Sequence, residues 1–274
     1  MTGAIAGPLL LVGCGKMGGA LLQGWLRQGA DPADILVVEP MADPHRVLAA
    51  PGVKMLAAPE QLPADFDPAV VVLAVKPQAM DDAAANYGRF ATPDTVFMSI
   101  AAGTKIAYFE RHFGADAAIV RVMPNTPAAV ERGMSVLCAN ARASAAQRGT
   151  CTGLMAAVGE TAWIEDEALM DAVTAVSGSG PAYVFLLIEC LAQAGVEAGL
   201  SEELAAQLAA ATVSGAGELA RQSAETPSQL RVNVTSPGGT TQAALEVLMA
   251  DDGLAPLLRR AVDAAARRSR ELGN

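Results

Sequence analysis

Residues that commonly bind metals are scarce in this sequence. It contains two histidines, His45 and His112, and four cysteines at positions 14, 138, 151 and 190. No C-x-x-C pair occurs, and no cysteine lies at metal-ligand spacing from a histidine. We therefore expect no metal site, and we expect the cysteines to act as small, reduced apolar residues.

Positive charge and long apolar runs are also limited. The formal net charge of −10 argues against binding to nucleic acid or to an anionic membrane. The longest uncharged, mostly apolar run, at 172–188, is short for a membrane span and contains Ser-Gly-Ser-Gly-Pro. The N-terminus has no basic segment followed by an apolar one, so we expect no signal peptide and a soluble cytoplasmic protein.

The stretch from Pro8 to Gly18 contains a familiar local motif. Four apolar residues from Leu9 predict a buried strand, which glycines and a helix-forming segment follow directly. A strand, a G-x-G-x-x-G turn and a helix form the fingerprint of a dinucleotide-binding site. In such a site Gly13 allows the tight turn, Gly15 the close approach of a pyrophosphate, and Gly18 the packing of helix on strand.

The pattern of apolar runs divides the chain into two parts. Buried strands are predicted at 34–38, 53–56, 69–75, 95–100, 118–122, 134–138 and 161–164, with a helix at 144–158. After residue 165, helices are predicted at 167–198, 201–223, 240–249 and 254–272, with a polar turn around Pro227. We therefore predict an α/β fold, with a Rossmann-type dinucleotide-binding domain at 1–165 followed by an all-α dimerisation and substrate domain at 166–274.

Glu39 ends the second predicted strand, 21 residues after Gly18. An acidic side chain at this place accepts hydrogen bonds from the adenosine ribose and repels a 2′-phosphate. No Lys or Arg occurs in the next five positions, so we favour NADH over NADPH. The alternative is a surface glutamate that only ends a strand.

The second half of the chain has no lysine and no histidine. Alcohol dehydrogenases usually need such a residue to relay the hydroxyl proton. Sugar-acid and β-hydroxyacid dehydrogenases share the glycine turn but have a lysine on the long helix that follows the nucleotide domain. Unless a first-domain lysine or a partner subunit supplies the proton, an imine is the better substrate, because it is protonated in solution and accepts hydride at carbon directly.

A loop of glycines and hydroxyl residues, 236–241, precedes the predicted helix at 240–249. Such a helix start exposes backbone amides that bind a carboxylate or phosphate. The Thr241 hydroxyl is suited to hydrogen-bond a ring nitrogen. On spacing alone, a capped helix start with a Pro-Gly turn is the simpler explanation, and Ser-Gly-Ser-Gly-Pro at 177–181 is equally explained as a kink between closely packed helices.

Seven motifs along nearly the whole chain make the sequence resemble the pyrroline-5-carboxylate reductases. They are Gly-Cys-Gly-Lys-Met-Gly at 13–18, Ala-Val-Lys-Pro-Gln at 74–78, Ser-Ile-Ala-Ala-Gly at 99–103, Met-Pro-Asn-Thr-Pro at 123–127, Ser-Gly-Ser-Gly-Pro-Ala-Tyr at 177–183, Gln-Leu-Arg at 229–231 and Val-Thr-Ser-Pro-Gly-Gly-Thr-Thr at 234–241. The first is shared with many oxidoreductases, whereas the last two together are highly specific.

The resemblance implies reduction of 1-pyrroline-5-carboxylate to L-proline, the last step of proline biosynthesis, with NADH or NADPH. The substrate carboxylate would bind the amides of the loop, and Thr241 would be the catalytic residue that orients the ring nitrogen. The implied substrate-binding residues are Ser179, Val234, Ser236, Gly238, Gly239, Thr240 and Thr241. The implied cofactor-binding residues are Gly13, Cys14, Gly15, Lys16, Met17, Gly18, Glu39, Val75, Lys76, Pro77, Ala101, Ala102 and Asn125.

The resemblance also implies a homo-oligomer. Family members form intertwined dimers through their helical domains, and some assemble into decamers, so the loop of one subunit would complete a site on its partner's nucleotide domain. Members often have an asparagine near the adenine after the third strand, where this chain has Ala57-Ala58-Pro59. The alternatives are a reductase of another imine or keto acid, which would need another loop or a catalytic lysine, and a non-enzymatic NAD(P)H sensor, which would not need the loop.

Overall fold

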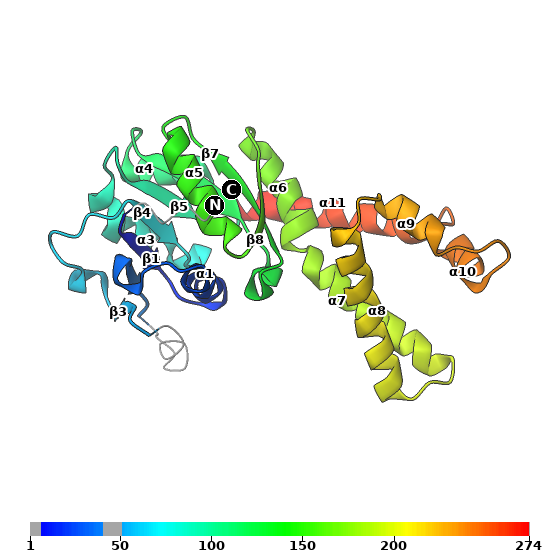
Figure 1. Cartoon of the computed structure of the whole chain (residues 1–274). Coiled ribbons are helices and arrows are strands. Elements are labelled where there is room, and N and C mark those ends of the chain that lie inside the picture. Colours follow the sequence, from blue (N-terminus) through cyan, green and yellow to red (C-terminus); the bar gives the residue numbers. More distant parts are fainter. Residues whose placement is uncertain (1–6, 41–50, 274) are drawn as a thin grey trace. The chain divides into compact units, whose positions relative to one another are not determined.

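The structure is a computed structural model that describes residues 7–40 and 51–273. Eight strands form one sheet in the order β3-β2-β1-β4-β5-β6-β7-β8 (Figure 1). Among these strands, neighbours pair in parallel except for β6 and β7, which pair antiparallel. The strands are β1 (Leu9–Val12), β2 (Ile35–Val38), β3 (Lys54–Leu56), β4 (Val70–Leu73), β5 (Val96–Ser99), β6 (Ala118–Met123), β7 (Gly133–Ala139) and β8 (Gly159–Trp163).

Helices cover both faces of this sheet, because successive strand residues point to opposite sides. Leu9 and Leu11 of β1 pack in one buried cluster with residues of α1 (Lys16–Arg27) and α5 (Ala145–Ala156). Leu10 and Val12 pack in a second cluster with α3 (Met80–Tyr87) and α4 (Ile106–Phe113). The fold class predicted from the apolar runs is confirmed, and the strand bounds agree within two residues.

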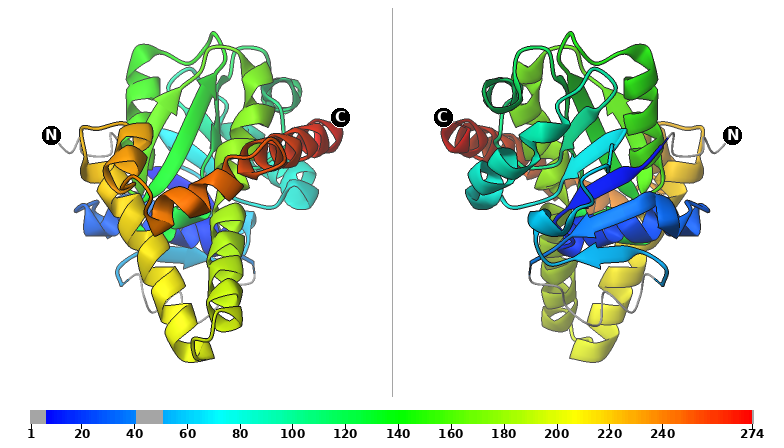
Figure 2. Two further views of the ribbon diagram at one scale, coloured as in Figure 1. Left: turned by 90° about the vertical axis from the view of Figure 1, so that its right-hand side faces the viewer. Right: turned by 90° about the vertical axis from the view of Figure 1, so that its left-hand side faces the viewer.

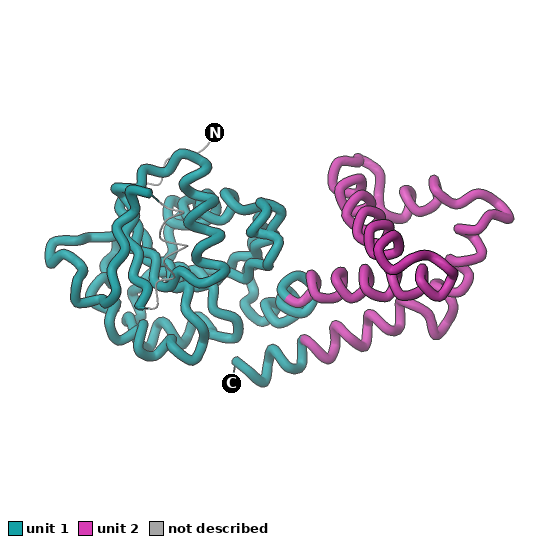
Figure 3. Tube along the Cα trace, turned by 90° about the horizontal axis from the view of Figure 1, so that it is seen from below, with its two compact units in different colours: residues 1–178, 266–274 teal, residues 179–265 magenta. Residues whose placement is uncertain are grey.

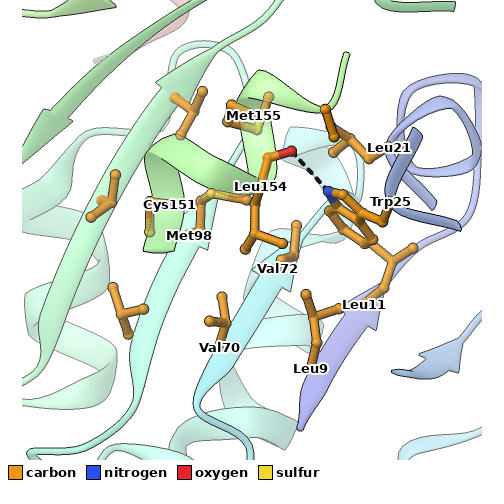
Figure 4. Close-up of a cluster of buried hydrophobic side chains, with 14 of the residues drawn as sticks. Leu9, Leu11, Leu21, Trp25, Val70, Val72, Met98, Cys151, Leu154 and Met155 are labelled. Atoms are coloured by element: carbon orange, nitrogen blue, oxygen red, sulfur yellow. Dashed lines mark hydrogen bonds between the residues drawn. The ribbon is translucent and has the colours of Figure 1, made fainter. Parts of the chain in front are cut away.

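The first cluster is fixed at its centre by a buried tryptophan of α1. Trp25 is 2% exposed, and its indole Nε1 donates a hydrogen bond of 2.8 Å to the carbonyl of Leu154 on α5 (Figure 4). Because the polar end of the indole has a partner, the ring is buried without an unsatisfied donor. This bond holds α1, and with it the end of the glycine turn, against α5.

Short helical segments connect the main elements of the sheet. They are η1 (Pro32–Asp34), η2 (Pro59–Gln61), η3 (Pro77–Ala79), η4 (Gly88–Phe90) and η5 (Thr126–Val130). Three of them begin with proline, whose fixed φ and missing N–H suit the first position of a helix.

The helical stretch at 167–197 is not broken at its glycines. It consists of η6 (Glu167–Leu169), α6 (Met170–Val173), the π-helical turn η7 (Thr174–Gly178) and α7 (Gly180–Glu197). The helix predicted at 167–198 is therefore present at nearly the same bounds, with a π-helical turn at 174–178 that overlaps the segment considered as a kink. By length and composition alone, this stretch is apolar enough to cross a membrane, with a mean hydropathy of 1.5.

The remaining helices include one that the sequence analysis missed. They are α8 (Glu202–Gln222), α9 (Pro227–Asn233), α10 (Thr240–Leu248) and α11 (Leu254–Leu272). The predicted polar turn around Pro227 is wrong, because Pro227 is the first residue of α9 and the Thr226 side chain caps it by accepting from the Gln229 amide. Figure 2 shows α7 and α8 lying side by side.

The chain forms two compact units, coloured separately in Figure 3. The first comprises residues 1–178 and 266–274, so it contains the sheet, η6, α6, η7 and the last two turns of α11. The second comprises residues 179–265 and contains the helices α7 to α10 and most of α11.

Candidate functional site

The glycine turn between β1 and α1 has the geometry that its sequence predicted. Gly13 has a φ of +90°, and a Cβ placed on it would lie 2.8 Å from the Ala74 carbonyl oxygen. A Cβ on Gly18 would lie 2.3 Å from the Gly13 carbonyl oxygen, so only glycine lets the helix pack this closely. By contrast, no described atom lies within 4 Å of a Cβ placed on Gly15, the N-cap residue of α1.

The open space at Gly15 adjoins a pocket along α1. No described side chain caps α1, so the amides of its first turn face this side without a side-chain acceptor. The lining residues are Cys14, Gly15, Lys16, Met17, Gly19, Ala20, Leu22, Gln23, Arg27, Thr126 and Ala129. An uncapped helix start beside open space fits the diphosphate of a dinucleotide.

Glu39 follows β2 and lies against the glycine turn. Its Oε2 accepts a hydrogen bond of 2.7 Å from the Cys14 amide, and the Gly13 amide donates to the Val38 carbonyl oxygen at 2.8 Å. The amide of Cys14 is therefore directed at a carboxylate of this chain. Residues 41–50, which follow Glu39 and include His45, lie outside the described part of the chain.

Two further groups of expected cofactor residues follow β4 and β5. Val75 is half-buried, while Lys76 and Pro77 are exposed at the start of η3. Ala101 is buried and Ala102 is exposed in the loop that follows β5. A second pocket includes two of them and is lined by Pro77, Met80, Ala102, Gly103, Thr104, Lys105, Ala107, Tyr108, Arg111, Leu272 and Gly273.

The last turn of α11 closes one side of this second pocket. Gly103 has a φ of +80°. A Cβ placed on Gly273 would lie 2.9 Å from the carbonyl oxygen of Gly103. The Ser269 hydroxyl donates to Asp171 Oδ1 at 2.5 Å. Contact between 269–273 and the β5 loop was not predicted from the sequence, which has no local signal for it.

Asn125 lies at the carboxyl end of β6, and its side chain contacts two other segments. Its Oδ1 accepts from the Met134 amide at 2.8 Å, while its Nδ2 donates to the carbonyl oxygen and the hydroxyl of Ser177, both at 3.3 Å. Asn125 was expected among the cofactor-binding residues, and its amide group is engaged by this chain.

The loop at 236–241 begins α10 in the second unit. Gly238 has a φ of +69°, and the Gly239 amide donates to the Ser236 carbonyl oxygen at 3.0 Å. The amides of Thr240 and Thr241 lie in the first turn of the helix, which provides them no backbone acceptor and no side-chain cap. Ser236 is exposed, while Thr241 is half-buried.

Gln242 is a loop contact that the sequence analysis missed. Its Oε1 accepts a hydrogen bond of 2.7 Å from the Gly238 amide, and its Nε2 donates to Glu246 Oε1 at 3.1 Å. Because Gln242 is four residues after Gly238, an acceptor at that spacing was the available signal. The other two expected substrate residues in this unit are Ser179, half-buried before α7, and Val234, which is 63% exposed.

Two buried thiols of the first unit, Cys138 and Cys151, are unsuited to act as nucleophiles. Burial raises the pKa of Cys151 to about 12, and burial with the nearby Glu167 carboxylate raises the pKa of Cys138. Among the described residues, no cluster of three His, Cys, Asp or Glu side chains has metal-binding geometry. The residues at the sheet edge therefore offer hydrogen bonds and shape to a ligand.

The helices of the second unit expose a large apolar surface. Examples are Phe185 at 57%, Leu186 at 58% and Leu208 at 47% exposure. Monomeric soluble proteins rarely expose contiguous apolar patches of this kind, and such patches mark interaction sites.

Two family models match separate segments of the chain. Residues 167–272 match the family model "Pyrroline-5-carboxylate reductase dimerisation", and residues 9–103 match "NADP oxidoreductase coenzyme F420-dependent". Pyrroline-5-carboxylate reductases of Pseudomonas aeruginosa and Pisum sativum are 42% and 39% identical to this chain, over 96% and 95% of its length and 96% and 94% of theirs.

Solved structures of the same family share the fold. The Coxiella burnetii pyrroline-5-carboxylate reductase superposes with a TM-score of 0.90 at 33% identity, over 98% of this chain and 99% of that one. The Plasmodium falciparum pyrroline carboxylate reductase, solved with NADP bound, gives a TM-score of 0.83 at 31% identity, over 99% and 100% of the two chains. With its glycine turn, its 234–241 loop and its dimerisation domain, this chain belongs to the pyrroline-5-carboxylate reductase family.

Proposed function

We propose that this protein reduces 1-pyrroline-5-carboxylate to L-proline with a reduced nicotinamide dinucleotide, as the last step of proline biosynthesis. The observation that carries the proposal is the start of α10, where the family-specific loop presents first-turn amides without acceptors beside the Thr241 hydroxyl. The substrate has a carboxylate that matches such amides and a ring nitrogen that matches a hydroxyl.

The residues of the proposed substrate site mainly bind and orient the substrate. We assign the substrate carboxylate to Ser236 and the amides of Thr240 and Thr241, and the ring nitrogen to the Thr241 hydroxyl. Gly238 and Gly239 shape the loop, and Ser179 and Val234 line the same site. When bound, the cofactor supplies the hydride that reduces the imine carbon. Because the imine nitrogen is protonated in solution, the site needs no lysine or histidine as acid, and residues 166–274 contain neither. Orientation of two bound reactants accounts for most of the rate enhancement.

The cofactor site is proposed to follow the carboxyl edge of the sheet. The diphosphate would bind at Gly15, Lys16 and Met17, where a Cβ on Gly15 would enter open space. The other residues of the proposed site are Gly13, Cys14, Gly18, Glu39, Val75, Lys76, Pro77, Ala101 and Ala102. We favour NADH, because the carboxylate of Glu39 at the end of β2 would repel a 2′-phosphate.

The assembly is proposed to be a homodimer of cytoplasmic subunits. The dimerisation domain matched at 167–272 and the exposed apolar side chains of the second unit support it. We assign residues 1–165 to cofactor binding and residues 166–274 to dimerisation and substrate binding. The loop at 236–241 of one subunit then completes a site on the partner's nucleotide domain.

A steady-state assay tests the proposal directly. Oxidation of NADH should depend on added pyrroline-5-carboxylate and should yield proline. Thr241→Ala should lower kcat by about tenfold or more through loss of one hydrogen bond to the reacting ring, while Thr241→Ser should retain most of the rate. NADH affinity, measured by fluorescence, should be the same in all three proteins. Wild-type activity in Thr241→Ala would contradict the role assigned to the hydroxyl.

A further inference from the structure

Asn125 occupies a helix N-cap position without capping the helix. It precedes η5 with an extended backbone (φ −132°, ψ 167°), and its side chain makes no capping bond to that segment. Asparagine at such a position usually accepts from an amide two or three residues later. Here the side chain instead accepts from the Met134 amide on β7, nine residues later. The side chain therefore connects the start of η5 to β7 and does not cap η5.

The other end of this amide holds the π-helical turn η7. Nδ2 of Asn125 lies 3.3 Å from both the carbonyl oxygen and Oγ of Ser177. A π-helical turn is rare within α-helices, and such turns are frequent at functional sites. Within the same turn, Thr174 Oγ1 donates back to the Met170 carbonyl oxygen at 2.8 Å. Side-chain bonds at both ends thus stabilise a backbone shape that helix geometry alone does not favour.

The methyl end of Met123, the last residue of β6, lies beside the same turn. A Cβ on Gly178 would lie 2.3 Å from Met123 Cε. Because this atom ends a flexible side chain, the contact does not by itself fix the turn. The hydrogen bonds from Asn125 are the contacts that hold Ser177 near the end of β6.

We propose that Asn125 is a positioning residue that sets the backbone of Ser177 and Gly178, from which Ser179 continues into α7, and that it acts on substrate binding through this turn and not by contact with the cofactor. The inference rests on the proposed substrate-binding role of Ser179. It assigns a task to the Met-Pro-Asn-Thr-Pro segment that the sequence alone placed in the cofactor site.

Asn125→Asp distinguishes a role in positioning Ser177 and Gly178 from a role in direct contact with the cofactor. The variant keeps the oxygen that accepts from Met134 but replaces the donor to the Ser177 carbonyl oxygen with an anionic oxygen. That oxygen repels the carbonyl oxygen and retains only the Ser177 hydroxyl as a hydrogen-bond partner. We expect KM for pyrroline-5-carboxylate to rise about tenfold, which is the change expected when one hydrogen bond is replaced by a repulsive contact with a charged oxygen. The Kd for NADH should be unchanged. Backbone amides of 170–180 should exchange hydrogen faster, as measured by mass spectrometry.

Asn140→Asp is the matched control. Asn140 is a buried asparagine near the other end of β6, where its Oδ1 accepts from the Ile119 amide at 3.1 Å and its Nδ2 donates to the Ala117 carbonyl oxygen at 2.9 Å. This substitution should lower the Tm and leave KM unchanged. Ser177→Ala, which removes only one of the two acceptors, should raise KM less than Asn125→Asp and adds a test that does not depend on the folding of that variant.

Two results would overturn the proposal. A raised Kd for NADH with normal KM for pyrroline-5-carboxylate in Asn125→Asp would indicate a direct cofactor contact. Unchanged hydrogen exchange at 170–180 would show that Asn125 does not hold the turn. If the wild-type protein failed to reduce pyrroline-5-carboxylate, the proposed function would fail, while the exchange experiment would still decide whether Asn125 sets the turn.

Discussion

The Glu39 carboxylate accepts a hydrogen bond of 2.7 Å from the Cys14 amide, so the residue that ends β2 also holds the glycine turn. The register of β1 and β2 explains this contact. Val12 pairs with Val38, so the residues that follow the two strands leave the sheet at the same level. One side chain therefore has a structural contact and a proposed role in the choice of cofactor.

Glu39→Gln distinguishes these two roles. The glutamine retains an oxygen for the Cys14 amide but removes the negative charge. We expect the ratio of kcat/KM for NADH to that for NADPH to fall by about tenfold, a change of 1.4 kcal/mol in relative transition-state binding. Asp34→Asn, which removes a charge just before the same strand, should leave the ratio unchanged. An unchanged ratio in Glu39→Gln would restrict this residue to its structural role.

Gly15→Ala should impair cofactor binding without impairing folding. Its new methyl group would meet no described atom within 4 Å, and the residue has a φ of −65° that alanine adopts readily. We expect the Kd for NADH to rise by about tenfold, since the methyl group would occupy space proposed for the diphosphate. Gly149→Ala, in an equally open position on α5, should leave the Kd unchanged. A normal Kd in Gly15→Ala would place the diphosphate elsewhere.

Gln242 should control the shape and charge of the substrate loop. Gln242→Glu keeps an acceptor for the Gly238 amide but places a carboxylate beside the proposed carboxylate site. We expect KM for pyrroline-5-carboxylate to rise by about tenfold at low salt and to recover partly at high salt, because screening weakens the repulsion. Gln242→Leu should raise KM without this dependence on salt. Equal salt responses would show that the substrate carboxylate binds away from this amide.

Glu167 should contribute to the stability of the first unit. Its Oε1 accepts from Arg121 Nη1 at 2.8 Å and from the Ile106 amide at 2.9 Å, and the Arg121 side chain is only 6% exposed. Glu167→Ala leaves that guanidinium buried without its carboxylate, which should lower the free energy of unfolding by about 2–4 kcal/mol.

The exposed ion pair of Arg148 and Glu165 provides the control for Glu167. Its charged atoms are 3.5 Å apart and the Glu165 side chain is 83% exposed, so Glu165→Ala should cost less than about 1 kcal/mol. Both variants require urea unfolding at one fixed protein concentration, because subunit association contributes to the stability that is measured. Equal losses of stability in Glu167→Ala and Glu165→Ala would contradict the inference that burial of Arg121 strengthens the effect of losing its ion pair.

The parts of the fold that depend on local sequence were predictable. Continuous apolar runs such as Val70–Leu73 identified the strands, and the helix predicted at 201–223 is present as α8, with Ser201 as its N-cap. The helix α9 was missed because Pro227 was interpreted as a turn residue, although Thr226 before it is a favourable cap. The eight-residue helices α3 and α4 received no assignment, although Ile106, Phe109 and Phe113 of α4 recur at helical spacing and are buried.

The contacts at the candidate site depend on segments far apart in the chain. Asn125 closely follows the strand predicted at 118–122, but its partner Ser177 is 52 residues away. The bond from Gly238 to Gln242 is local, and a search for acceptors four residues after the glycine would have found it. Residue types and motifs thus predicted candidate site residues, whereas the hydrogen-bond partners of each side chain could be found only from the fold.

The last turn of α11 has a consequence for biosynthesis of the protein. Ser269 bonds to Asp171, and Gly273 lies against Gly103, so the first unit contains residues that follow the whole second unit in the chain. During translation, the earlier residues of the first unit cannot complete this packing until residues 269–273 have been synthesised. The second unit is one continuous segment, so all of it is synthesised before the first unit can be completed.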